Sequence, residues 1–288
     1  MIAESAPAKI NLYLHIGPLR PDGLHELASL FVFAEGGDEI RAEKSSGLSL
    51  QITGPYAPAL AGEPIENNLV LRAAKSLQDH ADIKSGAAIT LEKSLPVAAG
   101  VGGGSADAAA ALRALIQLWN IDISEATLAR IAFKLGADVP ACLARAPVNV
   151  SGAGEKLELG PRLPPLWCCL VNPGVPMPTG PVFRAFDRGN PAPQKPAVIR
   201  MQTAGYETLV DALSNSRNDL ESYACDHAPV IRDVISMLAA APGALLARMS
   251  GSGATCFSLF SSGAAATRAA RKATGKGWWA MASPLHVR

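Results

Sequence analysis

The segment PVAAGVGGGSADA, residues 96–108, passes from glycines directly into an alanine-rich stretch. Glycines permit tight turns and a close approach of backbone N–H groups to a ligand, and the N-terminus of a following helix adds roughly half a positive charge. A di- or triphosphate fits such a cradle. The segment matches neither the P-loop pattern, which requires G-x-x-x-x-G-K-[ST], nor a dinucleotide-binding fingerprint in a βαβ unit. The spacing predicts an anion site at residues 100–105, with a plain glycine turn capped by Ser105 as the alternative.

Three further polar residues stand where they could act on a bound phosphate. Lys9 and Asn11 alternate with apolar residues, so a strand would place both on one face. Most strand lysines are solvated, and an asparagine often serves a nearby loop, so the pattern alone favours no ligand. Asp138 follows Gly136 and precedes Val139, which suits the cap of a short helix as well as a general base.

Hydrophobic periodicity and turn residues indicate the elements that carry these groups. Strands are predicted at 10–16, 31–33, 38–44, 48–53, 87–96, 146–152, 166–173, 244–253 and 255–260, and helices at 69–77, 105–119, 125–135, 178–186, 206–213, within 226–241 and at 262–275. Asn67 or Asn68 would cap the first helix and Ser124 the third. Runs of strands and helices without strict βαβ alternation predict an α+β fold with two lobes. A cluster of prolines after residue 160 places the boundary between residues 1–160 and 161–288.

Composition excludes several classes of protein. The 288 residues carry 26 basic and 25 acidic side chains, so no broad positive field would attract nucleic acid or an anionic membrane. Five cysteines without a C-x-x-C pair argue against a disulfide framework and against a zinc site. The N-terminus lacks a basic start before an apolar run, and no stretch reaches the ~18 apolar residues of a membrane span. We expect a cytoplasmic protein.

Three segments, in order along the chain, resemble the motifs of the GHMP kinase superfamily, which includes galactokinase, homoserine kinase and mevalonate kinase. They are APAKINLYLHIG at residues 6–17, P-x-x-x-G-V-G-G-G-S-A at 96–106 and MSGSGAT at 249–255. The resemblance spans nearly the whole chain. It implies a mixed α/β N-terminal lobe and a ferredoxin-like C-terminal lobe, with the active site in the cleft between them.

Four shorter segments are similar to one branch of this superfamily, whose substrate is an alcohol carrying a cytidine diphosphate group. They are R-x-D-G-x-H at residues 20–25, GADVP at 136–140, NPG followed by PT at 172–179, and NDLE at 218–221. That branch belongs to the non-mevalonate route to isoprenoid precursors. A galactokinase-type opening with an acidic sugar-binding motif is absent from the sequence.

The resemblance implies ATP as phosphoryl donor, Mg²⁺, Asp138 as base and Lys9 as its electrostatic partner. A positive charge beside the base would stabilise the charge that develops during transfer. Ser105 would contact Mg²⁺ or phosphate and could also cap its helix. The residues assigned to ATP are Pro96, Ala98, Ala99, Gly100, Val101, Gly102, Gly103, Gly104, Ser105, Ala106, Lys93 and Asn68. For the last two, a solvated lysine and a helix cap are equally good explanations.

The substrate side is assigned by the same resemblance to Asn11, Leu24, His25, Phe31, Thr179, Phe183, Gly251, Ser252 and Gly253. The family usually has a tyrosine, stacked on the cytosine, where this chain has Leu24. Base stacking on an aromatic ring contributes about 1–3 kcal/mol, so Leu24 would give apolar cover with less attraction. The expected partner is this small molecule alone, with no nucleic acid or membrane, acting on a monomer or weak homodimer. The alternatives are a GHMP kinase of mevalonate or homoserine type, and a non-catalytic nucleotide sensor, against which the retention of Lys9 and Asp138 argues.

Overall fold

The computed structural model describes residues 1–189, 191, 196–199 and 205–287. The chain forms two compact units that alternate along the sequence. The first unit comprises Met1–Ala8, Gly37–Val97 and Gly102–Ala144, and the second comprises Lys9–Gly36, Ala98–Val101 and Arg145–Arg288. Strands β1 (Ile2–Leu19) and β2 (His25–Ser45) run through both units. The predicted division into consecutive lobes at residue 160 stays a prediction.

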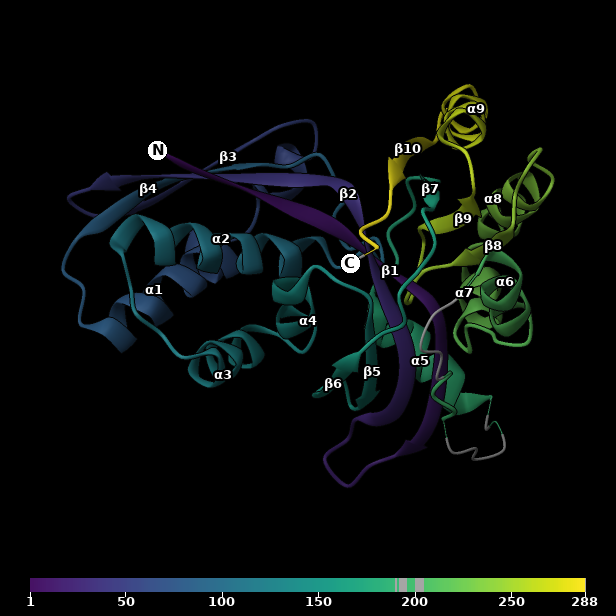
Figure 1. The fold of residues 1–288 in the computed structure, drawn as a ribbon, viewed down its shortest axis with the longest axis horizontal. Helices are drawn as coiled ribbons and strands as arrows, with labels where there is room; N and C mark the ends of the chain where they lie inside the picture. The colour runs from purple at the N-terminus through teal and green to yellow at the C-terminus, as the bar shows by residue number, and fades with distance from the viewer. Residues whose placement is uncertain (190, 192–195, 200–204, 288) are drawn as a thin grey trace. The chain divides into compact units, whose positions relative to one another are not determined.

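The first unit packs helices on a small sheet. Its elements are β3 (Leu48–Thr53), α1 (Leu69–Ala81), β4 (Gly86–Glu92), α2 (Gly103–Trp119), α3 (Glu125–Leu135) and α4 (Val139–Ala144), with short 3-10 turns at Ala57–Leu60 and Ile65–Asn67. Residues 39–45 of β2 pair antiparallel with β4, and β4 pairs parallel with β3. Helices α1 and α2 pack together on one side of these strands (Figure 1). The buried alanines of α2 allow this close packing because they add little side-chain volume.

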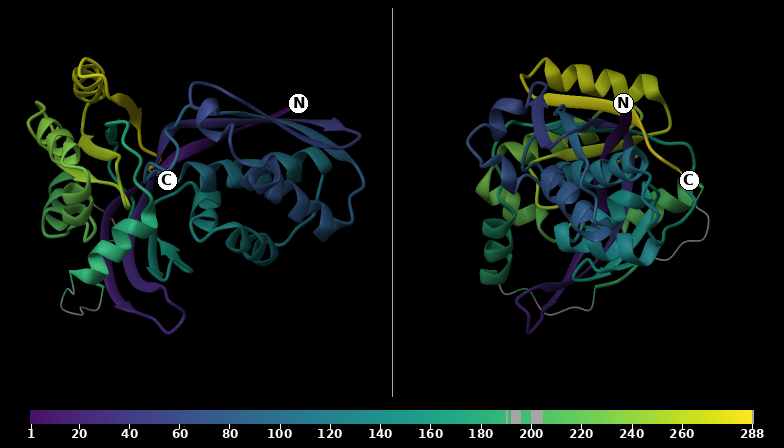
Figure 2. Two further views of the ribbon diagram at one scale, coloured as in Figure 1. Left: turned by 180° about the vertical axis from the view of Figure 1, so that it is seen from behind. Right: turned by 90° about the vertical axis from the view of Figure 1, so that its left-hand side faces the viewer.

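The second unit holds the rest of the sheet structure. Its elements are β5 (Val148–Gly152), β6 (Lys156–Leu159), β7 (Trp167–Asn172), α5 (Thr179–Arg188), α6 (Tyr206–Ser214), α7 (Glu221–His227), α8 (Val230–Ala239), β8 (Leu246–Met249), β9 (Cys256–Phe260), α9 (Gly263–Thr274) and β10 (Trp279–Pro284). Residues 27–31 of β2 pair with β5, which pairs with β6. A separate antiparallel sheet has the order β10-β7-β9-β8, and α8 and α9 pack on it. Helix α5 lies along the hairpin of β1 and β2 (Figure 2).

Most predicted elements are confirmed, and two local details show why. Asn68 caps α1, because its Oδ1 accepts a hydrogen bond from Val70 N at 2.9 Å. The amphipathic helix expected within residues 226–241 is α8, which begins directly after Pro229. Proline suits the start of a helix, where its missing N–H leaves no bond unmade.

Candidate functional site

In the second unit, the first half of the glycine-rich loop packs against the turn between β8 and β9. Gly100 has a φ of +76°, and a Cβ at this position would lie 2.5 Å from the Ser250 carbonyl oxygen and 2.8 Å from that of Gly253. No side chain fits there, so the sequence requires glycine. Ser250 Oγ donates to Gly100 O at 3.0 Å, and Thr255 N donates to Ala99 O at 3.2 Å. The predicted second and third motifs therefore lie side by side.

Strand β1 completes this arrangement by placing Lys9 beside the loop. Its backbone N–H donates to Val101 O at 2.9 Å. Its Nζ donates to Asn11 Oδ1 at 2.8 Å and lies 4.4 Å from the centre of the Phe31 ring. Lys9 is only 5% exposed, and Asn11 3%. The solvated lysine that the bare pattern favours is therefore wrong, because both faces of this strand are buried. The Phe31 ring and the Asn11 amide therefore hold the Lys9 side chain in a buried position beside the glycine-rich loop.

Asn11 is itself fixed on three sides. Its backbone N–H donates to Ser250 Oγ at 3.1 Å, and its Nδ2 donates to Ser29 Oγ at 2.9 Å. Ser29 Oγ donates in turn to Tyr13 O at 2.5 Å. A Cβ on Gly251 would lie 3.3 Å from Asn11 Oδ1, so the turn also approaches this side chain closely. Ser250 lies within the third motif, whereas no motif marks Ser29, whose partner Asn11 is 18 residues away.

Residues 218–221, the NDLE segment, brace the same turn. Asn218 Nδ2 donates to Met249 O at 2.9 Å and to Gly251 O at 2.8 Å. Asp219 Oδ2 accepts from Ile16 N at 2.7 Å, which ties the segment to β1. A carboxamide provides two donors and so satisfies both carbonyl groups at once. The segment positions the turn and the strand rather than offering its amide to a ligand.

In the first unit, the second half of the glycine-rich loop opens helix α2. Gly102 is the N-cap residue, with a φ of +63° and no side-chain cap, and the helix begins at Gly103. Gly103, Gly104 and Ser105 therefore form the first turn, where backbone N–H groups have no partner within the helix. The cap expected from Ser105 is wrong, because this residue lies inside the helix. Free N–H groups and the helix dipole make this turn suitable for an anion.

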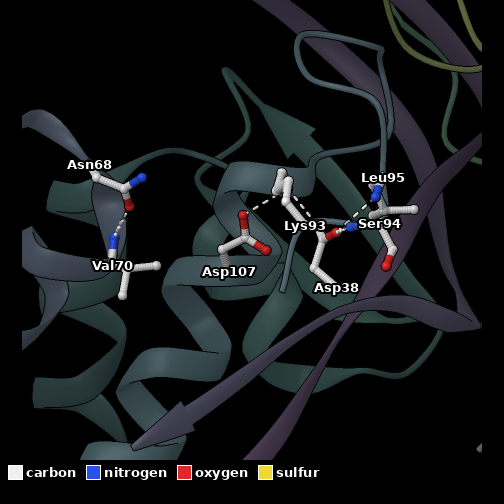
Figure 3. A network of polar contacts seen from close by, with 7 residues as sticks. All are labelled: Asp38, Asn68, Val70, Lys93, Ser94, Leu95 and Asp107. Atoms are coloured by element: carbon white, nitrogen blue, oxygen red, sulfur yellow. Dashed lines mark hydrogen bonds and ion pairs between the residues drawn. The ribbon is translucent and has the colours of Figure 1, made fainter. Parts of the chain in front are cut away.

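A buried ionic cluster supports that helix start (Figure 3). Lys93 Nζ donates to Asp107 Oδ2 at 2.8 Å and to Asp38 Oδ2. Asp38 Oδ1 also accepts from the backbone N–H groups of Ser94 at 2.6 Å and Leu95 at 2.8 Å. The three charged side chains are buried. The cluster ties β2, the residue after β4 and the second turn of α2 together.

The charges of the cluster do not cancel, since one ammonium faces two carboxylates. Burial alone lowers the pKa of Lys93, but Asp107 and Asp38 outweigh it and raise that pKa above the ordinary value. Burial raises the pKa of Asp107 to about 7, against the attraction of Lys93. A Cβ on Gly103 would lie 3.0 Å from Lys93 Nζ, so the ammonium also approaches the loop backbone. The contact of Lys93 with adenosine stays a prediction, while its observed partners are these two carboxylates.

Asp138 lies in the same unit as Ser105, at the start of α4. It is partly buried, and its backbone carbonyl accepts from Cys142 N at 3.1 Å. Gly136, two residues before Asp138, lies close to α2, because a Cβ on Gly136 would lie 3.9 Å from Ser105 Oγ. Its catalytic role stays a prediction.

The residues predicted to bind substrate fall into two groups in the second unit. Thr179 Oγ1 lies 3.0 Å from Ser252 Oγ, which joins the start of α5 to the β8–β9 turn. His25 lies between two aromatic rings of α5, 5.7 Å from the ring centre of Phe183, and its Nδ1 lies 3.0 Å from Gly17 O. Leu24 is 54% exposed and makes no part of this cluster of rings. Each assignment to substrate stays a prediction.

The described residues contain no group of three or more histidine, cysteine or acidic side chains arranged to hold a metal ion. None of the helices in the described ranges is both long and apolar enough to cross a bilayer.

Comparisons with known proteins assign the chain to a family. The model of the GHMP kinase N-terminal domain matches residues 68–145, and that of the C-terminal domain matches residues 204–277. The chain is 48% identical over 287 residues to the 4-diphosphocytidyl-2-C-methyl-D-erythritol kinase of Hyphomonas neptunium, covering 97% of this chain and 95% of that one. It is 51% identical over 284 residues to the enzyme of the same name from Cereibacter sphaeroides, covering 97% of each chain.

A solved structure agrees with the sequence comparison. The crystal structure of a 4-(cytidine 5'-diphospho)-2C-methyl-D-erythritol kinase superposes with a TM-score of 0.79 at 33% identity and covers 99% of both chains. The predicted two-lobed α+β fold is thereby confirmed. This chain belongs to the GHMP kinase family.

Proposed function

We propose that this kinase transfers the γ-phosphoryl group of ATP to the 2-hydroxyl of 4-diphosphocytidyl-2-C-methyl-D-erythritol. The observation that carries this proposal is the similarity to kinases of that name over 97% of the chain. The glycine-rich loop, residues 96–106, lies within residues 68–145, which the N-terminal family model matches.

In the proposed reaction, the hydroxyl oxygen of the acceptor forms a bond to the γ-phosphorus. The bond from that phosphorus to the β–γ bridging oxygen breaks, and ADP leaves. Asp138 takes the proton of the hydroxyl, and the Lys9 ammonium offsets negative charge on the reacting oxygens. The free N–H groups of the first turn of α2 bind phosphate oxygens. Each group acts by position and charge, which are the main contributions a protein makes to phosphoryl transfer.

We include Mg²⁺ as the metal that accompanies ATP. Magnesium is usually held by one or two protein groups together with phosphates and water, so the Ser105 hydroxyl in the first turn of α2 is a suitable contact. Bound Mg²⁺ would neutralise phosphate charge. We further propose a cytoplasmic enzyme, monomeric or weakly dimeric, whose partner is this small molecule.

Turnover of defined acceptors tests the substrate directly. Purified protein with ATP and Mg²⁺ should release ADP with 4-diphosphocytidyl-2-C-methyl-D-erythritol, and not with mevalonate or homoserine. CDP should compete with the acceptor and not with ATP. Turnover of mevalonate or homoserine, without turnover of the cytidine compound, would reject the proposal, and ATP binding without any turnover would favour a sensor.

Asp138→Asn tests the proposed base. General base catalysis contributes roughly 10²- to 10⁴-fold, so we expect kcat to fall by at least about 100-fold with little change in ATP affinity. Asp122→Asn is the matched control, because Asp122 is an exposed aspartate of the same unit. If Asp138→Asn instead lowers kcat only in proportion to a loss of folded protein, seen by circular dichroism, then Asp138 is a structural cap.

A further inference from the structure

The hydrogen bonds around Asn11 form a chain, and the groups at its two ends decide which atom donates and which accepts at each step. Lys9 Nζ can only donate, so the Asn11 atom 2.8 Å away must be the carbonyl oxygen. At the other end, Tyr13 O can only accept, so it takes the single proton of the Ser29 hydroxyl, 2.5 Å away. Ser29 Oγ must then accept from Asn11 at 2.9 Å, which requires the amide nitrogen there. Both ends independently demand the same orientation of the amide.

Reversal of that amide would place an NH₂ group against the Lys9 ammonium. Two donors would then face each other in a site where Lys9, Asn11 and Ser29 are all buried. Unpaired buried donors cost far more than exposed ones, since water cannot replace the missing acceptor. Together with Lys9, the hydroxyl of Ser29, 0% exposed, keeps the amide from turning.

We propose that Ser29 is a positioning residue for phosphoryl transfer, because its hydroxyl holds the Asn11 amide in the orientation that presents Oδ1 to Lys9. Ser29 itself touches no reacting atom; it acts through Asn11 on the place and direction of the ammonium. This inference rests on the proposed function, in which Lys9 stabilises the transferring group. In this arrangement both ends of the Asn11 amide bind groups of the protein itself, because its oxygen accepts from Lys9 and its nitrogen donates to Ser29.

Ser29→Ala removes the acceptor at Asn11 and the donor at Tyr13. We expect kcat to fall about 10- to 100-fold, with less than about threefold change in the KM for ATP. This is the effect of losing one buried hydrogen bond to the amide that positions the Lys9 ammonium. Ser29→Thr keeps the hydroxyl and should restore most of the activity. Ser29→Cys keeps the size of the side chain with a weak thiol acceptor and should be impaired like alanine.

Ser258→Ala provides the matched control for a buried serine in the same unit. Ser258 is buried in β9, and its Oγ has no hydrogen-bond partner among the described residues. This variant should keep wild-type kcat. If it loses activity as Ser29→Ala does, the effect is a general consequence of changing the core, and the proposal is wrong.

Asn11→Asp distinguishes orientation from simple packing. A carboxylate presents an oxygen on both sides, so it has no orientation for Ser29 to fix. In an Asn11→Asp background, Ser29→Ala should therefore change the remaining kcat by less than about threefold. An equal loss in both backgrounds, or wild-type kcat in Ser29→Ala alone, would overturn the proposal. Wild-type protein that turns over no acceptor would instead reject the proposed function, so the two failures are separable.

Discussion

The buried cluster of Asp38, Lys93 and Asp107 should make the stability of the protein depend on pH, and Asp107→Asn should remove that dependence. Burial raises the pKa of Asp107 to about 7 from 3.8. The folded state therefore holds a proton that the unfolded state has released. By linkage, the unfolding free energy contributed by this group falls as pH rises through this interval and is flat above the folded pKa.

The size of the effect follows from the pKa of about 7 in the folded protein. Between about pH 5 and about pH 7 the contribution of Asp107 to the unfolding free energy falls by roughly 1.4 kcal/mol per pH unit, and it falls little further by about pH 8. The wild-type protein should thus lose about 3 kcal/mol over this range from Asp107 alone. The variant keeps an oxygen that can accept from Lys93, yet its side chain does not titrate.

Urea unfolding of both proteins at several pH values, followed by far-ultraviolet circular dichroism, measures this difference. Burial lowers the pKa of His15 and of His286, and these groups also alter stability with pH, but they are common to both proteins and cancel in the comparison. We expect the wild type to lose about 3 kcal/mol more than Asp107→Asn between the acidic and the basic end. If the change in unfolding free energy across this pH range differs between the two proteins by less than about 1 kcal/mol, the raised pKa of Asp107 is refuted.

Three further outcomes follow from local geometry. Gly100→Ala forces a side chain into a φ of +76°, 2.5 Å from the Ser250 carbonyl, and should lower kcat/KM for ATP by at least about tenfold, whereas Gly62→Ala, outside the loop and with no neighbour within 4 Å of the added Cβ, should be close to wild type in the same assay. Ser124→Ala removes the hydroxyl that accepts from the backbone at the start of α3 and should cost about 1 kcal/mol in urea unfolding; no change would mean that this cap contributes nothing. Burial raises the pKa of Cys225 to about 11, and all five cysteines are buried, so the native protein should react with a thiol reagent near pH 8 only after urea is added. Rapid labelling without urea would contradict this.

Local chemistry explains why some features were predictable. The helix at residues 103–119 follows from a run of good helix formers, and the caps at Asn68 and Ser124 depend only on residues within three positions of them. The site motifs were visible for a similar reason. The glycines before the helix and the short motifs are runs of consecutive residues, so they can be recognised without knowledge of the fold.

Other features could not be read in this way. Lys9 follows the same alternation as a solvated strand lysine, and only the packing of β1 between its neighbours makes it buried. Ser105 has a good capping side chain, yet Gly102 takes the cap position because its left-handed backbone starts the helix earlier. Lys93 pairs with carboxylates 55 and 14 residues away, and no local signal marks either partner.

The sequence by itself indicated the family and the order of most elements, and it predicted an anion site at the glycine-rich loop, because each depends on residues that are neighbours in the chain. Tertiary structure alone decided which side chains hold that site in place. Ser29 and Asn11, Asn218 and the β8–β9 turn, and the Asp38–Lys93–Asp107 cluster are contacts over long sequence separations. The physical reason is that a buried polar group must find a partner wherever the fold brings one, and the chain gives no local record of where that will be.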